Sequence, residues 1–258
     1  MSAIIRYTLI TALRDLLFIG LLAIALIAMY VSSFLGSTAV SEQGEMTISY
    51  MAGSTRLINV VGLVIFVCFH VRRSFENKEI EMILSKPISR TAFIISYWAG
   101  FALLAVIISF SLGVLMYGFA HSHHIGLLYW TGSIMCESLM MVAFAMLASL
   151  IFGSAVTSAL STLSFYFLAR MMGYFVTAIN FKPYAYLPTG DNFLHWFGDL
   201  ILTTTSVAIP RLDLFGKSSW LIYGIEEFHD WMVFPIQSLI YIPFLLLMAI
   251  FDFRRKQF

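Results

Sequence analysis

The sequence predicts an all-α integral membrane protein with six transmembrane helices, and three observations support this fold class. Of the 258 residues, 60% are hydrophobic and only 11% are charged, whereas a soluble chain carries about 25% charged residues. The mean hydropathy is +0.89. The apolar residues gather into six stretches, and a helix needs about 20 apolar residues to cross a bilayer. Six crossings leave no room for a large soluble domain, so residues 1–258 are expected to form a single membrane domain.

The six predicted spans can be given as residue ranges. They are Leu16–Leu35, Leu57–Val71, Ala92–Phe119, Leu127–Ile151, Ala155–Val176 and Met232–Phe251. The second stretch is short, so we expect it to extend outward through Ile48–Ser54. Arg56 would then reach back to the lipid headgroups by snorkelling.

Residues 1–15 precede the first span. Their apolar residues recur at helical spacing, while Arg6 and Arg14 take other faces, which predicts an amphipathic helix lying on the membrane surface. A cleaved signal peptide is the rival interpretation, because Ser37-Thr38-Ala39 offers the small residues of a cleavage site. The apolar run before that site is longer than the roughly 7–15 residues of a signal-peptide core. We therefore expect the segment to be retained as an interfacial helix.

The distribution of Lys and Arg predicts the orientation of the chain. Six crossings place both termini on one side, and ten of the fifteen basic residues fall on that side. Four fall on the opposite side, and Arg170 lies within an apolar run. Because basic residues favour the cytoplasm, both termini are predicted to be cytoplasmic. The segment 72–90 is then cytoplasmic, and the segment 180–231 is external, with amphipathic pieces at Phe193–Phe197 and Leu200–Leu202.

The cytoplasmic segment contains one short predicted helix, Phe75–Leu84. Its apolar residues form a stripe, its charged residues cover the rest, and Pro87 stops it. The stripe consists of Ile80, Ile83 and Leu84, and the charged residues are Glu76, Lys78, Glu79 and Glu81. We expect this helix to expose its stripe to the cytosol and to transmit force from a partner protein. An ordinary solvated loop that obeys the positive-inside rule is the alternative interpretation.

The same residues resemble a known family. Glu76 followed by 80–90, with the sequence IEMILSKPISR, looks like the E-x-x-x-(I/L)-E-x-(I/L)-L-(S/A)-x-P-(I/V)-S-R pattern after the second span of ABC-2 type transporter permeases. The segment 209–215 resembles the P-(N/R)-L-x-x-F element often found before the last span of that family. Many members have Gly-Thr where this chain has Lys78-Glu79, which puts the geometry of that turn in question. The overall layout also resembles the family, including a re-entrant or interfacial external segment before the last span.

The resemblance implies a function and a set of partners. The chain would be the transmembrane permease subunit of an ABC-2 type ATP-driven exporter in a bacterial cytoplasmic (inner) membrane. It would form a dimer with a second copy or a related permease, and separate ATPase subunits would bind and hydrolyse ATP, so this chain would have no cofactor and no enzymatic activity. The residues implied to couple to the ATPase are Glu76, Glu79, Ile80, Glu81, Ile83 and Leu84.

Composition bears on the other partners. The net charge of +1 gives no indication of a nucleic acid partner. The 24 Phe and 14 Met residues suit a cavity for a lipid-like or hydrophobic substrate, and they suit contact with membrane lipid equally well.

Several motifs in the chain imitate chemical sites. Gly216-Lys217-Ser218-Ser219 ends like a Walker A loop, but Arg211 stands where the first glycine is required. His121, His123 and His124 could bind Cu or Zn, although a polar turn between two spans explains them more simply. His70 is expected to contact headgroups, and neither Cys68 nor Cys136 indicates a disulfide or a metal site.

Two ionisable residues fall inside predicted spans. Glu137 and Arg170 are expected at depths of about 15 Å and about 12 Å from the outer surface, at 1.5 Å per helical residue. Because a charge at bilayer depth costs at least ~2.5–3.5 kcal/mol and usually has a partner, we expect an intramembrane ion pair. Lining a translocation path for a polar headgroup is the functional alternative. These residues also leave open an autonomous secondary transporter or channel, while an intramembrane enzyme lacks a paired nucleophile and base.

Overall fold

The computed structural model describes residues 2–14, 17–85, 88–119, 123–180, 200, 204–205, 209–224 and 228–255. Within these ranges the chain forms helices and turns, with no strand. In chain order the helices are α1 (Ser2–Arg14), α2 (Leu17–Ser37), α3 (Gln43–Glu76), α4 (Glu79–Leu84), α5 (Arg90–Phe119), α6 (His124–Ile151), α7 (Ala155–Asn180), η2 (Leu212–Leu214), α9 (Ser219–Tyr223) and α10 (Phe228–Arg255). The six longest apolar helices, namely α2, α3, α5, α6, α7 and α10, are long and apolar enough to cross a membrane. The predicted all-helical class with six spanning helices is confirmed at this level.

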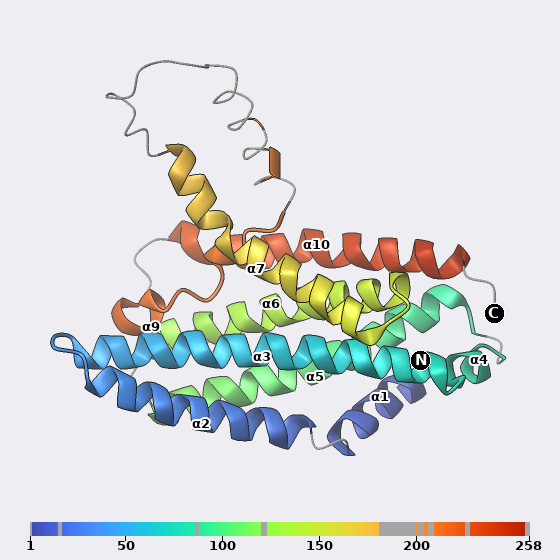
Figure 1. The fold of residues 1–258 in the computed structure, drawn as a ribbon, viewed down its shortest axis with the longest axis horizontal. Helices are drawn as coiled ribbons and strands as arrows, with labels where there is room; N and C mark the ends of the chain where they lie inside the picture. Colours follow the sequence, from blue (N-terminus) through green and yellow to red (C-terminus); the bar gives the residue numbers. More distant parts are fainter. Residues whose placement is uncertain are drawn as a thin grey trace.

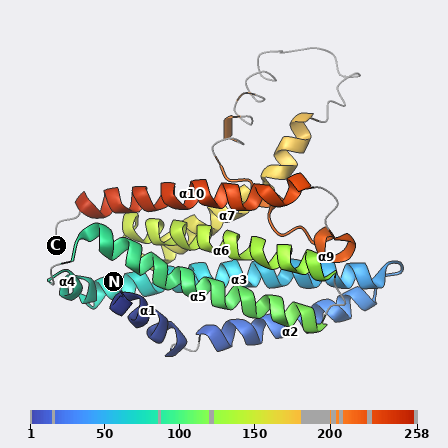
Figure 2. The same cartoon turned by 180° about the vertical axis from the view of Figure 1, so that it is seen from behind.

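The six helices run up and down in one bundle (Figure 1). Both chain termini, α4 and the turn between α6 and α7 lie at one end, which we call the terminal end (Figure 1). The turn between α2 and α3 and the short helix α9 lie at the opposite end, which we call the distal end (Figures 1 and 2). The terminal end corresponds to the side on which the sequence concentrates its basic residues.

Helix α6 forms the centre of the bundle. It contacts α3, α5, α7, α9 and α10. Of its most apolar 18-residue stretch 72% is buried, and the corresponding share is 22–28% in α2, α7 and α10. The outer helices expose large apolar side chains, such as Tyr30 on α2 at 74% and Leu239 on α10 at 76%. A soluble monomer rarely carries so much contiguous apolar surface, so these faces suit lipid or another membrane protein.

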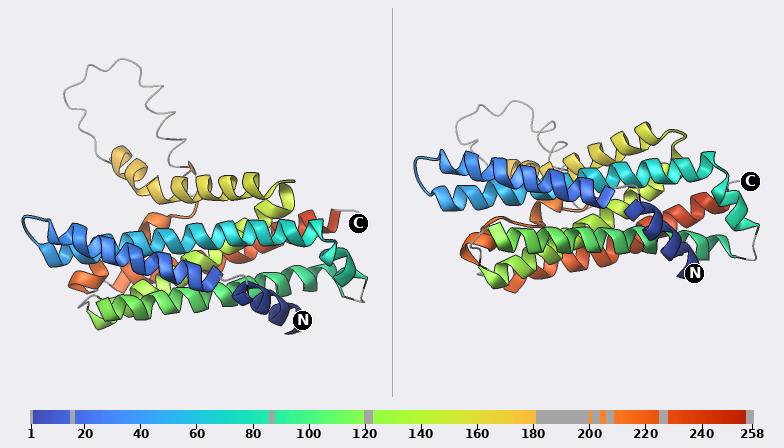
Figure 3. Two further views of the ribbon diagram at one scale, coloured as in Figure 1. Left: turned by 60° about the horizontal axis from the view of Figure 1, so that its bottom comes forward. Right: turned by 90° about the horizontal axis from the view of Figure 1, so that it is seen from below.

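Helix α1 packs along α5 and also contacts α2 (Figure 3). Thr8 is fully buried, and a Cβ atom at Gly100 of α5 would come within 2.8 Å of the Thr8 Cβ atom. Glycine at position 100 therefore permits the close approach of the two helices. The helix predicted at 1–15 is present as α1, and one of its faces packs against the bundle.

Helix α3 starts earlier than the hydropathy of the sequence indicates. It has 34 residues and begins at Gln43. At 1.5 Å per residue it is about 51 Å long, against about 30 Å for the hydrocarbon core of a bilayer. Its polar first half packs against α2, where the hydroxyls of Ser32 and Ser54 lie 3.1 Å apart in a hydrogen bond. Packing against α2 gives these polar residues of α3 partners inside the protein. A hydropathy average over the sequence takes the same residues for the end of the span.

Residues 209–224, which we call the distal segment, pack into the distal half of the bundle. The side chains of Leu212, Phe215 and Leu221 are fully buried, and Trp220 is 2% exposed. The segment contacts α3, α6, α7 and α10 through η2 and α9. Gly126 of α6 touches the backbone of Trp220 so closely that no Cβ atom would fit there. The sequence allowed a re-entrant or an interfacial segment before the last span. Residues 209–224 pack into the bundle. Phe193–Phe197 lies outside the described residues, as does most of Leu200–Leu202.

Candidate functional site

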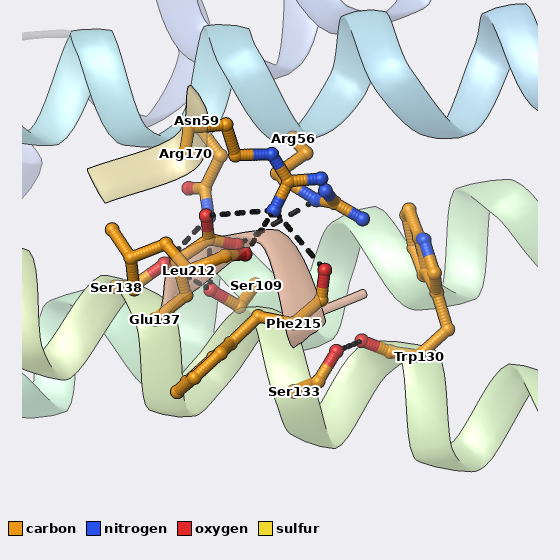
Figure 4. A network of polar contacts seen from close by, with 10 residues as sticks. All are labelled: Arg56, Asn59, Ser109, Trp130, Ser133, Glu137, Ser138, Arg170, Leu212 and Phe215. Atoms are coloured by element: carbon orange, nitrogen blue, oxygen red, sulfur yellow. Dashed lines mark hydrogen bonds and ion pairs between the residues drawn. The ribbon is translucent and has the colours of Figure 1, made fainter. Parts of the chain in front are cut away.

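The middle of the bundle holds one buried carboxylate between two arginines. Glu137 on α6 has a fully buried side chain, and its Oε2 atom lies 3.5 Å from Nε of Arg56 on α3. Its Oε1 atom lies 3.7 Å from Nη1 of Arg170 on α7 (Figure 4). The structure thus brings Glu137 and Arg170 together and adds Arg56, which sequence reasoning placed elsewhere. A network of one anion and two cations carries an excess positive charge.

Arg170 also connects the spans to the distal segment. Its Nη1 atom donates hydrogen bonds to the carbonyl oxygens of Leu212 at 2.5 Å and Phe215 at 3.1 Å. Irregular backbone at membrane depth is tolerated only where protein groups satisfy its polar atoms. Arg170 therefore provides a hydrogen-bond donor that the buried 3₁₀ turn η2 requires. Figure 4 shows both carbonyls directed toward the arginine.

The expectation for Arg56 is wrong. Only 4% of Arg56 is exposed, and it lies inside the bundle rather than at the headgroups. Because α3 begins 13 residues earlier at Gln43, Arg56 stands roughly 20 Å from the helix start at 1.5 Å per residue. Glu137 also lies 13 residues from the start of α6, which places the two side chains at the same level. The spacing of Arg56 and Asn59, one helical turn apart, was the available sign of a polar face.

A second polar cluster continues from this turn. The amide of Asn59 donates to the hydroxyl of Ser138 at 2.8 Å and to that of Ser109 at 3.1 Å. The two hydroxyls lie 3.3 Å apart, and all three residues are buried. These contacts tie α3, α5 and α6 together beside Glu137 (Figure 4). None of Asn59, Ser109 and Ser138 was predicted from the sequence.

Helix α4 at the terminal end is the second candidate site, and its orientation corrects one expectation. Ile80 is only 2% exposed and Ile83 packs partly buried against the same core, so these two residues of the apolar stripe face the bundle and not the cytosol. Met82, which sequence reasoning passed over, is 71% exposed. An isolated apolar stripe buries itself against the nearest apolar surface, which here is the protein's own core. The side chains of Glu81 and Leu84 lie outside the described residues.

Two charged residues around α4, Glu76 and Glu79, interact with side chains of this chain. Glu76 is exposed, and its Oε1 atom lies 2.9 Å from Nε of Arg72 one turn earlier. Burial, and then the neighbouring Glu79 carboxylate, raise the pKa of Tyr7 on α1 above its usual range.

The turn at Lys78 has the geometry that glycine favours. The φ angle of Lys78 is 56°, in the left-handed region. The chain therefore makes a turn with lysine at the position where the ABC-2 pattern has glycine.

A cavity of about 640 Å³ opens beside this end of α3. Its lining combines the end of α3 with the turn between α6 and α7 and includes Arg72, Arg73, Glu76 and Ser154. The terminal end therefore presents a hollow of mixed charge at the end of α3, from which the chain continues into α4.

The histidines give no metal site among the described residues, where no group of three or more His, Cys, Asp or Glu side chains could hold a metal ion. His70 is 7% exposed and packs against the rings of Phe66 and Phe101, so its expected headgroup contact is wrong. His123 accepts a 3.5 Å hydrogen bond from the Gly126 backbone at the start of α6. His121 lies outside the described residues.

The comparisons with known proteins leave the chain without an assigned family. No protein-family model matches the sequence, and no curated protein is detectably similar to it.

Proposed function

We propose that this protein is the membrane subunit of an ATP-driven exporter of the ABC-2 permease type, with α4 as its contact to a separate ATPase. The observation that carries the proposal is that α4 is packed on the bundle along one side and exposed along the other. One side is fixed to the bundle by Ile80 and Ile83, and Met82 on the other side is exposed. The resemblance of residues 76–90 to the permease pattern supports the same conclusion.

This arrangement suits the transmission of force. A helix that moves the spans must be held to them more firmly than to its partner, and burial of Ile80 provides such an anchor. A partner then needs only a small contact. Met82 is a suitable anchor for that contact, because a flexible methionine adapts to an apolar pocket. Glu76 and the cavity beside it offer the polar rim that surrounds such anchors.

The proposal extends to location and assembly. The terminal end would face the cytoplasm of a bacterium, where ATP is available, in line with the ten basic residues on that side. The exposed apolar faces of α2 and α10 would contact lipid or a second permease subunit. The substrate would be lipid-like or hydrophobic, in keeping with the abundance of Phe and Met.

The test compares two exposed methionines. Met82→Ala removes the proposed anchor, and Met171→Ala removes a methionine that is 52% exposed on the spanning helix α7. The permease is purified from its native membrane, and any accompanying ATPase is identified and its ATP hydrolysis measured. Anchors of this kind are worth at least ~2 kcal/mol, so Met82→Ala should weaken association by roughly 30-fold and Met171→Ala should not. Absence of an ATPase from the wild-type preparation would contradict the proposal.

An autonomous secondary transporter or channel is the second candidate, and the buried charge cluster favours it. Intramembrane ionisable residues mark ion or substrate pathways by default. Reconstitution of the chain alone into sealed vesicles separates the two functions. Transport driven by an ion gradient without an ATPase, and lost in Glu137→Gln, would replace the exporter proposal.

A further inference from the structure

The distal half of the bundle contains a cavity whose lining is positively charged. The cavity is about 310 Å³, at the lower end of the range of about 300–1,000 Å³ for small-molecule pockets. Its walls come from α3, α7 and the distal segment. The lining residues are Ser49, Gly53, Arg56, Arg170, Gly216, Lys217, Ser218 and Ser219. None of these lining residues is acidic.

Arg56 is the feature that suggests a ligand. Its side chain is 5% exposed and lines the cavity, but its Nε atom has no hydrogen-bond partner within the described part of the chain. The contact with Glu137 at 3.5 Å is an ion pair without a hydrogen bond. The Nε atom faces Glu137, so the N–H donors left for a ligand are those of the two Nη atoms, and Nη2 lies beside Gly216 in the cavity wall.

Gly216 shows how the distal segment accommodates the arginine. A Cβ atom at Gly216 would lie 2.2 Å from Nη2 of Arg56, and the φ angle of Gly216 is 52°. Only glycine satisfies both conditions without strain. The Gly-Lys-Ser-Ser sequence that imitates a nucleotide loop thus places its glycine against Arg56 and its next three residues in the cavity wall.

The charges and hydroxyls favour one class of ligand. Arg56 and Arg170 share the single carboxylate of Glu137, so the pair keeps one excess positive charge. Lys217 adds a third cation to the lining. These donors approach from three elements, which suits a tetrahedral anion better than a planar carboxylate. Arginine also recognises phosphate through paired hydrogen bonds.

We propose that this cavity binds an oxyanion of the phosphate class, either as a free solute or as the headgroup of a lipid. The site lies in the distal half of the bundle, and no α4 residue lines it, so its test does not require the proposed ATPase. In the bound state the anion accepts hydrogen bonds from Arg56 and from the hydroxyls of the distal segment. Lys217 stabilises its charge.

The experiment uses the full chain alone in phosphatidylcholine nanodiscs, with inorganic phosphate as the probe. Arg56→Gln would remove one of the two cations beside the buried Glu137 and risk misfolding, so the test variant is Lys217→Gln. The matched control is Arg211→Gln, which removes a cation of the same segment that does not line the cavity. Charged hydrogen bonds are worth about 1.5–3 kcal/mol, so Lys217→Gln should weaken phosphate binding at least about tenfold. Arg211→Gln should bind as the wild type does.

A lipid arm identifies the source of the anion. If the ligand is a headgroup, free phosphate binds weakly, and nanodiscs that contain phosphatidic acid raise the unfolding temperature of the wild type. Lys217→Gln should lose that increase, and Arg211→Gln should keep it. Two results would overturn the proposal: no effect of phosphate or phosphatidic acid beyond that of chloride at equal ionic strength, or equal losses in both variants.

Discussion

At the terminal end, α4 turns Met82 outward at 71% exposure, whereas at the distal end Leu212, Phe215 and Leu221 are fully buried. Both regions are short elements that connect spanning helices. They differ in their supply of internal polar partners. The distal segment accepts hydrogen bonds from Arg170 at two of its carbonyls, and the backbone N–H of Arg211 donates to the Gln237 side chain of α10. Among its described contacts, α4 packs mainly on α3.

The difference shows what allows a connection to enter a membrane bundle. Apolar residues alone do not suffice, because both elements have them. The irregular backbone of η2 is buried because a cation inside the bundle satisfies its carbonyls. A connection without such a cation stays at the surface and is free to meet a partner. The following predictions test this contrast, beginning with the largest expected effect.

The first prediction concerns the side of the membrane that each end faces. Single cysteines at Ser41, in the exposed distal turn, and at Asn77, in the exposed turn before α4, are compared in intact cells. An impermeant thiol reagent should label position 41 and leave position 77 unlabelled until the cells are opened. The wild type, in which Cys68 is buried and Cys136 is half-buried, provides the background. Labelling of position 77 in intact cells would invert the proposed orientation.

The second prediction concerns the cation that holds the distal segment. Arg170→Met leaves the carbonyls of Leu212 and Phe215 without this donor and removes one of the two cations beside Glu137. Loss of one partner of a buried pair costs ~3–5 kcal/mol, so the variant should unfold at markedly lower denaturant concentration. Arg72→Met, which breaks an exposed pair with Glu76, should change stability by less than about 1 kcal/mol.

Arg56 also affects what a charge exchange should do. If Glu137 and Arg170 were an isolated pair, swapping them would restore part of the lost stability. With Arg56 3.5 Å from Glu137, the exchange sets two arginines together and directs a carboxylate at the carbonyls of η2. We therefore expect the exchanged protein to be less stable than either single variant. Recovery in the exchange would show that Arg56 contributes little.

The third prediction concerns the turn that presents α4. Lys78 has a φ angle of 56°, which costs an L-residue about 1–2 kcal/mol. Lys78→Gly should therefore stabilise the protein by about 0.5–1 kcal/mol after the entropy of glycine in the unfolded chain is subtracted. Lys78→Ala, which keeps the strained angle and removes the charge, should give no such gain in equilibrium unfolding.

The smallest expected effect is a change in the pKa of two tyrosines, Tyr7 at the terminal end and Tyr223 at the distal end. Burial is the main cause that raises the pKa of Tyr7, followed by Glu79, whereas a hydrogen bond to Glu45 is the main cause that raises the pKa of the exposed Tyr223. A raised pKa means that the folded state favours the neutral phenol. Its contribution to stability is complete below the ordinary tyrosine pKa of about 10 and is lost as the pH rises through the folded value.

Carboxylate removal should separate the two tyrosines. Glu45→Gln should return the Tyr223 pKa most of the way to its ordinary value, and Glu79→Gln should lower the Tyr7 pKa only in part because burial remains. NMR titration of labelled tyrosines measures both. Equal shifts in the two variants would mean that burial does not distinguish the two ends.

Hydropathy was sufficient to predict the six spanning helices, because each lipid-facing helix must be apolar over most of its length. The expected extension of the second span through Ile48–Ser54 is confirmed, because α3 contains those residues. The expectation for Arg56 failed, because its side chain faces Glu137 inside the bundle instead of the headgroups. The proximity of Glu137 and Arg170 followed from matched depth along helices of known rise. The burial of Ile80 could not be predicted from the sequence, because helical periodicity identifies an apolar stripe but does not show which surface covers it.

Helix α3 runs without a break from Gln43 to Glu76, so the distal cavity and α4 lie along one rod. Twenty residues separate Arg56 from Glu76, about 30 Å at 1.5 Å per residue. A rod that shifts in response to an event at one end changes the free energy of binding at the other. Such coupling is reciprocal: if an ATPase on α4 altered the affinity of the cavity for its anion by some factor, the anion would alter the affinity for the ATPase by the same factor.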